Sequence, residues 1–182
     1  MPATFVIEPT HSRFGFTVRH LGFSKVRGHF GAFSGTITFD PSDLSTLTAE
    51  ASAETASINT ANEQRDAHLR SADFFDAEAN PAVTFVSTRV ENVSGSTFTL
   101  VGDLTMHGVT REVAFEAEHL GSETDPWGNV RHAFEATASV NRTDFGLNWN
   151  AVLESGGLLV SEKVEISLEL QTIPAPVEEP AA

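Results

Sequence analysis

The sequence of 182 residues contains no cysteine, no tyrosine and only two lysines, Lys25 and Lys163. Without cysteine, the chain can form no disulfide, no catalytic thiolate and no cysteine-based zinc site. No run of about 18 apolar residues occurs, so no helix is expected to span a membrane and stable membrane insertion is not expected. The first residues show neither a basic region nor an apolar core, so no signal peptide is visible and a cytoplasmic location is expected.

Basic residues are scarce as a class. The chain has 11 Lys and Arg against 25 Asp and Glu, which gives a formal net charge of −14. Binding to nucleic acid or to an anionic membrane surface requires clustered Lys and Arg side chains. The overall charge therefore argues against both partners.

The aromatic residues are mostly phenylalanine, since the chain has 14 phenylalanines, two tryptophans and no tyrosine. Tyrosine carries a hydroxyl that needs a hydrogen-bond partner when it is buried, whereas phenylalanine does not. An interior lined by phenylalanine is therefore dry. It forms either an ordinary core or the wall of an apolar pocket.

Apolar and polar residues alternate along most of the chain, as is typical of β-strands with one buried face. The alternation is clear in Arg13–His20, where Phe14 and Phe16 share a face, and in Thr97–Met106. A shift of phase next to Gly31 predicts a β-bulge. The chain contains about eight such strands, mostly joined by short connections. This pattern predicts an all-β fold, an eight-stranded antiparallel barrel, with a sandwich as the alternative.

An eight-stranded barrel is wide enough to be filled by side chains or to hold one small ligand. The segment Leu47–Ala53 places three small residues, Ala49, Ala51 and Ala53, on its inward face, which leaves room inside. The strands are long, so a tall and narrow cavity is expected. Such a cavity suits a long linear apolar molecule.

One segment departs from the strand pattern and predicts a short helix over Asn62–Arg70. A helix of about nine residues is not stable alone in water, so it must dock on the rest of the protein. Arg65, His68 and Leu69 are spaced i, i+3 and i+4 and therefore share one face. We expect this face to cover one end of the barrel.

Short motifs follow one another in a specific order along residues 5–172. They are the pair His11–Ser12, Phe14-x-Phe16-x-Val18-x-His20, Gly28-x-Phe30-x-x-Phe33-x-Gly35, Thr60, the helix residues Arg65, Asp66, His68 and Leu69, Phe74–Phe75–Asp76, Asn80–Pro81, Phe85-x-Ser87-Thr88, Gly102-x-Leu104-Thr105-x-x-Gly108-x-Thr110, and Arg142-x-Asp144-Phe145-Gly146. In this order the motifs resemble the YceI-like family, which has a lipocalin-like barrel and binds polyisoprenoids or related lipids.

The resemblance implies a lipocalin-like barrel over residues 1–172 that binds a long-chain apolar small molecule, often as a homodimer, with no established enzymatic chemistry. No cofactor is expected other than a bound lipid or isoprenoid. Residues 173–182 are rich in Pro and Glu, and their composition predicts a disordered tail.

The candidate site combines an apolar wall with a polar end. The expected cavity-lining residues are Phe14, Phe16, Phe30, Phe33, Phe75, Phe85, Leu104, Phe145 and Trp149. The residues expected to meet the polar end of the ligand are His20, Arg65, His68 and Arg142. Both arginines have an alternative role in salt bridges with Asp66, Asp73, Asp76 or Asp144.

The seven histidines leave a second class of function open. His11, His20 and His68 together have the ligand types of a zinc site, but no HExxH spacing supports one, and no GxSxG elbow marks a nucleophilic serine. His107, His119 and His132 are expected on the surface or in turns. We therefore expect neither a metal site nor catalytic residues. The alternatives are a His- or metal-assisted enzyme that uses the same pocket, and an interaction module with a filled core.

Overall fold

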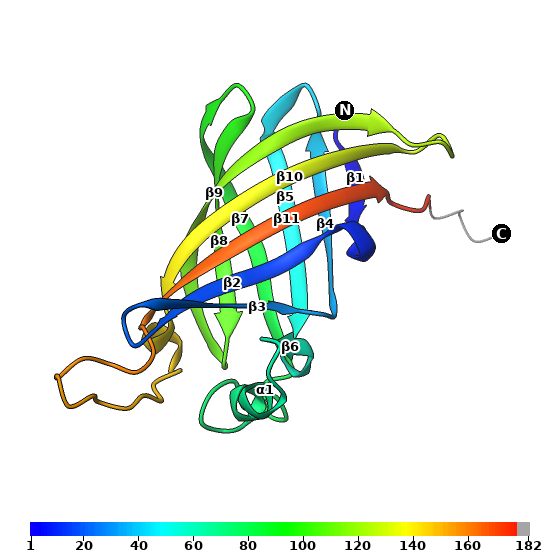
Figure 1. Ribbon diagram of the computed structural model, residues 1–182. Helices are drawn as coiled ribbons and strands as arrows, with labels where there is room; N and C mark the ends of the chain where they lie inside the picture. Colours follow the sequence, from blue (N-terminus) through cyan, green and yellow to red (C-terminus); the bar gives the residue numbers. More distant parts are fainter. Residues whose placement is uncertain (178–182) are drawn as a thin grey trace.

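Residues 1–177 are described by a computed structural model that is built almost entirely from β-strands (Figure 1). Eight strands close into an antiparallel barrel, and the pairing of β1 with β11 completes the ring. This confirms the barrel and rules out the sandwich. The eight strands, in the order in which they are paired, are β1 (Ala3–Ile7), β4 (Phe33–Asp40), β5 (Asp43–Glu54), β7 (Ala82–Ser94), β8 (Thr97–Met106), β9 (Val109–Thr124), β10 (Val130–Asn141) and β11 (Lys163–Pro174).

A second layer of pairing extends the barrel wall at one end. The 3-10 helix η1 (Pro9–His11) interrupts the chain after β1, and β2 (Arg13–His20) then continues along β11. A hairpin joins β2 to β3 (Ser24–Phe30), and the short strand β6 (Ile58–Asn59) pairs with the end of β3.

The phase shift at Gly31 does not mark a bulge, so that expectation is wrong. β3 pairs with β2 and β6, whereas β4 pairs with β1 and β5. The chain turns a corner at Gly31 and Ala32, and a new strand begins with a new phase.

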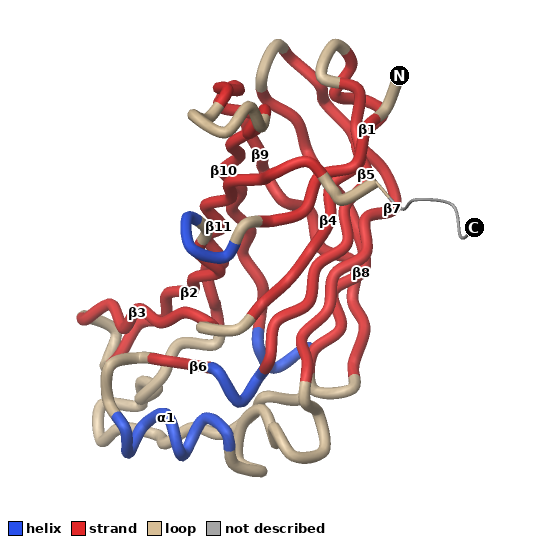
Figure 2. Tube along the Cα trace, turned by 90° about the vertical axis from the view of Figure 1, so that its right-hand side faces the viewer, coloured by secondary structure: helices blue, strands red, loops and turns tan. Residues whose placement is uncertain are grey.

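The predicted helix is present as α1 (Glu63–Arg70), with Asn62 as its N-cap. The Asn62 side chain accepts a hydrogen bond from the Arg65 backbone N–H at 2.9 Å. Figures 1 and 2 show α1 lying across the lower end of the barrel, beneath β6. Two further 3-10 helices, η2 (Thr55–Ser57) and η3 (Arg142–Phe145), lead into and out of the strands at this end.

The barrel continues beyond the expected domain end at residue 172. Ile173 and Pro174 pair with β1, and the Ala175 N–H donates to the Thr4 carbonyl oxygen at 3.0 Å. Residues 173–175 of the predicted tail therefore belong to the barrel wall, and the expectation of disorder from residue 173 is wrong. Residues 178–182, the remainder of the predicted tail, lie outside the described residues.

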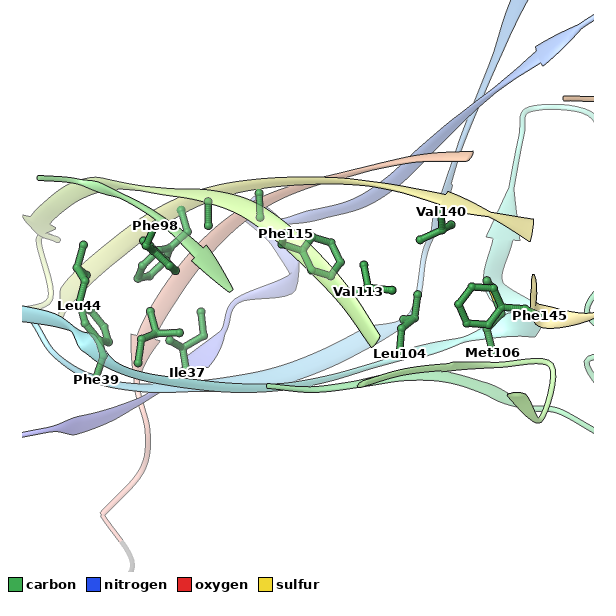
Figure 3. Close-up of a cluster of buried hydrophobic side chains, with 14 of the residues drawn as sticks. Ile37, Phe39, Leu44, Phe98, Leu104, Met106, Val113, Phe115, Val140 and Phe145 are labelled. Atoms are coloured by element: carbon green, nitrogen blue, oxygen red, sulfur yellow. The ribbon is translucent and has the colours of Figure 1, made fainter. Parts of the chain in front are cut away.

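The inward side chains form one cluster that follows the barrel axis. Figure 3 shows this cluster running from Phe39 and Leu44 at one end to Met106 and Phe145 at the other. Phe39 is fully buried and packs against Phe5 and Phe134, with ring centroids 5.4 and 5.5 Å away. These three rings close the barrel at the end opposite α1.

Candidate functional site

The interior holds a cavity of about 610 Å³ between the closed end and α1. This volume lies within the range of small-molecule sites, roughly 300–1,000 Å³. Seven of the nine apolar residues expected at the wall line it, and all four expected polar residues line it as well. They are Phe14, Phe16, Phe30, Phe75, Phe85, Leu104 and Trp149, with His20, Arg65, His68 and Arg142.

Phe33 and Phe145 do not line the cavity, so these two expectations are wrong. The Phe33 ring stacks on Phe14 with centroids 4.2 Å apart and supports that ring from behind. Phe145 belongs to η3 and is buried at the end of the core cluster beside Met106 (Figure 3). Both residues hold the wall in place without reaching the cavity.

Most of the remaining wall comes from strand residues of the same parity as those expected. On β11, Val164, Ile166, Leu168 and Leu170 all face the cavity. Their alternation with Glu165, Ser167 and Glu169 was the signal that could have placed them. The other apolar residues at the wall that were not expected include Phe74, Phe98, Phe115 and Phe134.

The helix α1 presents its expected face to the cavity, since Arg65, His68 and Leu69 all line it. Arg65 lies beside Thr60: its Nε donates to the Thr60 hydroxyl and its Nη2 to the Thr60 carbonyl, both at 2.7 Å. Asp66 makes no ion pair with it. The buried Asp66 carboxylate instead accepts from the Thr60 backbone N–H at 2.9 Å and from the Thr60 hydroxyl at 2.5 Å. Thr60 thus links the helix to the end of β6.

His68 forms part of an aromatic group at the same end. Its ring meets Trp149 and Phe74 edge-on, with centroids 4.8 and 5.1 Å away. Its Nε2 lies 2.8 Å from a carboxylate oxygen of Asp73. The His68 ring is therefore held at the cavity end by packing on one side and by a carboxylate on the other.

Arg142 is only 4% exposed, and backbone carbonyl oxygens surround it. Its Nη1 donates to Leu147 and Trp149 at 2.6 and 2.9 Å, Nε donates to Ser161 at 2.9 Å, and Nη2 donates to Val160 at 3.3 Å. The alternative role of Arg142 in a salt bridge with Asp144 is not borne out, since no such ion pair is formed. Burial lowers the pKa of the Arg142 guanidinium from its usual value, and the nearby Glu162 opposes this effect. Arg142 is thus the clamp that shapes the loop from Leu147 to Ser161.

The charged residues at the cavity all have the same sign. Among residues 1–177, three arginines and two histidines line the cavity, whereas no aspartate or glutamate does. This contrasts with a chain in which acidic residues outnumber basic ones by more than two to one. The cavity is apolar along its length and basic at the end near α1.

His119 and His132 are not surface residues, so that expectation is wrong. His132 is 3% exposed, and its Nδ1 lies 3.0 Å from Nε2 of His119. Both rings pack against Phe39 at the closed end of the barrel. Burial lowers the pKa of both histidines, and the charge of His119 lowers the pKa of His132 further. The signal was their parity: His119 is in phase with Ala117, and His132 is in phase with Phe134.

The three histidines of the alternative zinc site, His11, His20 and His68, do not come together. His11 lies on η1, with its Nδ1 2.6 Å from Glu8, whereas His20 and His68 lie at the cavity. In the part of the chain that the structure describes, no three side chains of His, Asp or Glu come close enough to hold a metal ion. Over the same residues, no helix is long and apolar enough to cross a membrane.

Known proteins are similar to this chain in sequence and in fold. A UPF0312 protein of Pseudomonas paraeruginosa is 37% identical over 166 residues, which cover 91% of this chain and 83% of that protein. The crystal structure of BcnA from Burkholderia cenocepacia matches with a TM-score of 0.79 at 20% identity, over 91% of this chain and 98% of that one. A polyisoprenoid binding domain from Saccharophagus degradans matches with a TM-score of 0.67 at 16% identity, over 96% and 100% of the two chains.

The family model of the YceI-like domain matches residues 5–172. The match spans α1 and all of the barrel except the first two residues of β1 and the last two of β11, and it includes each residue that lines the cavity. The chain belongs to the YceI-like family.

Proposed function

We propose that this protein binds one long-chain amphiphile, without chemical conversion, with its apolar chain inside the barrel and its polar end beside α1. The observation that carries the proposal is the single-signed cavity: an apolar wall that ends in arginine and histidine, with no carboxylate among the described lining residues. Burial of an apolar chain contributes roughly 25 cal/mol per Å² before entropic costs. The apolar wall provides this burial energy, and the basic end determines which way round the ligand lies in the barrel.

Arg65 is the best placed partner for the polar end of the ligand. Its Nε and one Nη2 hydrogen are used by Thr60, and within residues 1–177 its Nη1 has no hydrogen-bond partner. Arg142 differs, because four backbone carbonyls already occupy its donors. We therefore assign recognition of an acceptor or anionic group to Arg65 and His68, and the shaping of the opening to Arg142.

The cavity volume bounds the chain that fits. At about 30 Å³ for each water-sized group, 610 Å³ accommodates roughly 20 such groups. An isoprenoid of the length of geranylgeraniol or a long fatty acyl chain fills this space. The likeness of fold to a polyisoprenoid binding domain supports the isoprenoid. A much longer polyprenyl chain has to leave the barrel past α1.

The chain offers its own probe for binding. Trp149 lines the cavity, and the only other tryptophan, Trp127, is exposed on the β9–β10 turn. Protein carrying Trp127→Phe, purified without detergent and stripped with organic solvent, is titrated with farnesol, geranylgeraniol, geranylgeranyl phosphate, solanesol, a quinone and palmitate. Mass spectrometry of the solvent extract identifies any ligand that was carried through purification.

A paired substitution shows whether the cavity is the site. Ala136 faces the cavity from β10, and its neighbour Thr137 faces solvent on the same strand. Ala136→Phe fills the cavity and should abolish the Trp149 response, whereas Thr137→Phe should leave it unchanged. An empty extract together with no response to any of the six compounds would show that the interior is merely core.

A further inference from the structure

The acidic residues of this chain are unevenly distributed. Residues 9–39 contain no aspartate or glutamate, so all 25 lie elsewhere, whereas Arg13, Arg19, Lys25 and Arg27 fall inside this segment. The segment comprises η1, β2, β3 and most of β4. A chain with a net charge of −14 thus carries a local formal charge of +4 on one wall.

The register of the β2–β3 hairpin concentrates this charge on its outer face. Arg19 lies directly opposite Lys25, and Arg27 lies two residues further along β3. Like charges directly opposite each other on paired strands are destabilising. Among residues 1–177, none of these three side chains has a carboxylate within ion-pair distance. The neighbouring strand β11 carries Glu169 opposite Arg13 and Glu165 opposite Thr17. Thr17 in turn faces Arg27, so Glu165 lies level with Arg27 but one strand away, whereas Arg19 and Lys25 lie nearer the tip.

The tip of the hairpin is apolar and strained. Phe23 is 82% exposed, and Leu21 is also exposed. Leu21 and Gly22 have φ angles of 54° and 74°. The connection has three residues, Leu21 to Phe23, between the paired residues His20 and Ser24. A positive φ angle favours Gly or Asn, and a branched side chain in this region costs free energy. The chain thus keeps leucine where asparagine would relieve strain, and it keeps phenylalanine in water.

A second exposed apolar turn lies beside this tip. Leu21 N–H donates to the Leu159 carbonyl at 2.9 Å, and His20 bridges to Val160. The adjoining small hairpin pairs Val152 with Leu158, and Val152 is 76% exposed. Figure 1 shows this loop next to the β2–β3 hairpin, at the end of the barrel where α1 lies. We name the four exposed residues, Leu21, Phe23, Val152 and Leu158, the apolar tip.

The apolar tip is continuous with the cavity. Arg19, His20, Leu159 and Val160 come from the same two segments, and all four line the cavity. Arg19 belongs to both sets, because it lines the cavity at its rim while its exposed side chain donates from Nη1 to the Phe23 carbonyl at 3.1 Å. The tip, the three cations of the hairpin and the basic end of the cavity therefore occupy one corner of the molecule. Two acidic residues, Glu154 and Glu162, lie in the same loop as Val152, between η3 and β11.

We propose that this corner docks on the interface of an anionic lipid bilayer. The apolar tip enters the boundary between headgroups and acyl chains, and Arg19, Lys25 and Arg27 face the lipid phosphates. Basic side chains near such a surface contribute about 1 kcal/mol each. The acidic remainder of the chain is repelled by the same surface, so charge complementarity selects one orientation. The strongly negative net charge argues against binding to an anionic membrane, but it is an average that hides this basic corner.

Docking in this orientation brings the basic end of the cavity to the bilayer. An amphiphile then passes between membrane and barrel without its apolar chain crossing water. This consequence rests on the proposed function, whereas the docking itself does not.

Flotation with vesicles tests the docking. Protein is mixed with phosphatidylcholine vesicles that contain or lack phosphatidylglycerol, at low and high salt, and the bound fraction is measured. We expect binding only to the anionic vesicles, weakened by salt. The double variant Lys25→Glu with Arg27→Glu should lower the partition coefficient roughly thirtyfold or more, since it removes two basic side chains. Phe23→Ser should lower it about tenfold, because a phenylalanine side chain no longer leaves water.

Matched controls separate the tip from general changes. Trp127→Ser removes an equally exposed aromatic residue from the turn between β9 and β10. Arg111→Glu reverses an exposed charge on β9. Both variants should bind to the vesicles as the wild type does. Equal binding by the tip variants and the controls, or no binding by the wild type, overturns the proposal. A concentration-dependent dimer that Phe23→Ser abolishes overturns it in favour of a second copy of this chain.

A transfer measurement keeps the two proposals apart. Phe23→Ser should slow the uptake of geranylgeraniol from anionic vesicles, while its affinity in solution, read from Trp149, stays unchanged. If no compound binds in solution but flotation gives the expected result, the proposed function fails and the docking stands. If compounds bind but flotation shows no difference between variants, the docking fails and the proposed function stands.

Discussion

Arg142 stands out because its charge is buried without a carboxylate partner. Hydrogen bonds to charged donors contribute roughly 1.5–3 kcal/mol, and a carbonyl left unpaired in the interior costs about 1–3 kcal/mol. The planar guanidinium reaches four carbonyls from three directions, which a lysine ammonium cannot do. The residue serves the site by holding the loop that carries Trp149.

Replacing Arg142 by lysine should destabilise the protein despite the conserved charge. We expect a loss of about 2–4 kcal/mol in the free energy of unfolding, because at least two carbonyls lose their donors. Urea denaturation measures the loss, and limited proteolysis should cut between Leu147 and Ser161. Arg111→Lys, at an exposed position, is the control and should change neither quantity. Wild-type stability in Arg142→Lys would mean that the carbonyl contacts hold nothing in place.

The buried pair His119 and His132 should make stability depend on pH. Burial lowers both pKa values in the folded state, so the unfolded chain binds protons more readily below its ordinary histidine pKa near 6.5. Stability is then fully present above about pH 6.5 and falls as the pH decreases through the lowered values. Asp125 titrates at lower pH, since its hydrogen bond from Arg131 lowers its pKa to about 2.

Thermal unfolding between pH 5 and pH 7.5 checks this dependence. His132→Asn retains a polar atom near Nδ1 but does not titrate, so it should flatten the pH dependence in this window. His29→Asn, on β3 opposite Gly15, should keep the wild-type dependence. The same slope in all three proteins would show that the pair does not control acid stability.

Of the features of the site, the sequence best predicted which strand side chains face the cavity. Alternation placed Phe14, Phe16 and Phe85 at the wall because successive side chains on a strand face opposite sides. It failed for Phe33, which lies where the chain turns a corner and another ring covers it. Phe145 failed because it belongs to a 3-10 helix, whose direction depends on distant contacts.

At the scale of elements, α1 depends on a few polar contacts. Its buried Asp66 binds Thr60 through two hydrogen bonds, and the cap at Asn62 satisfies one backbone N–H. The spacing of Arg65, His68 and Leu69 predicted which face meets the cavity. It did not predict the Asp66–Thr60 contact, because the Asp residues were considered only as partners of arginine. Asp66 and Arg65 each form hydrogen bonds with Thr60, and they do not form an ion pair with each other.

Asp66→Ala should release α1 without unfolding the barrel. We expect a loss of about 2–4 kcal/mol, because the buried Thr60 N–H and hydroxyl lose their acceptor. Hydrogen exchange of Glu63–Arg70 should become faster, while β8 and β9 stay protected. Glu63→Ala removes an exposed carboxylate that lies 3.7 Å from Arg70, so it is the control with little expected change. Unchanged exchange in Asp66→Ala would place the stability of α1 elsewhere.

The β2–β3 hairpin shows that the net charge of a chain does not reveal where its charged residues gather. The net charge and the alternation are properties of the sequence, and neither depends on which strands pair. That Arg19 and Lys25 face each other follows only from the register, and that the apolar tip adjoins the cavity follows only from the pairing of His20 with Val160. Long-range pairing of segments some 140 residues apart is what local patterns leave open.

At the scale of the whole molecule, ligand binding should be visible as stability. A barrel with an apolar cavity gains free energy when an amphiphile fills it, because the ligand binds the folded state alone. At a free ligand concentration one hundred times Kd, the gain is about 2.7 kcal/mol. For a domain of this size, this raises Tm by roughly 5–10 °C.

Thermal unfolding of solvent-stripped protein, with and without geranylgeraniol, measures this shift. Ala136→Phe occupies the cavity permanently, so it should show no shift with ligand, and the extra buried ring keeps its own Tm near or above that of the stripped wild type. Thr137→Phe should shift as the wild type does. A shift of equal size in Ala136→Phe would place the ligand outside the barrel, on a surface such as the apolar tip. A shift that is confined to proteins with an open cavity ties the stability of the whole barrel to the molecule that it carries.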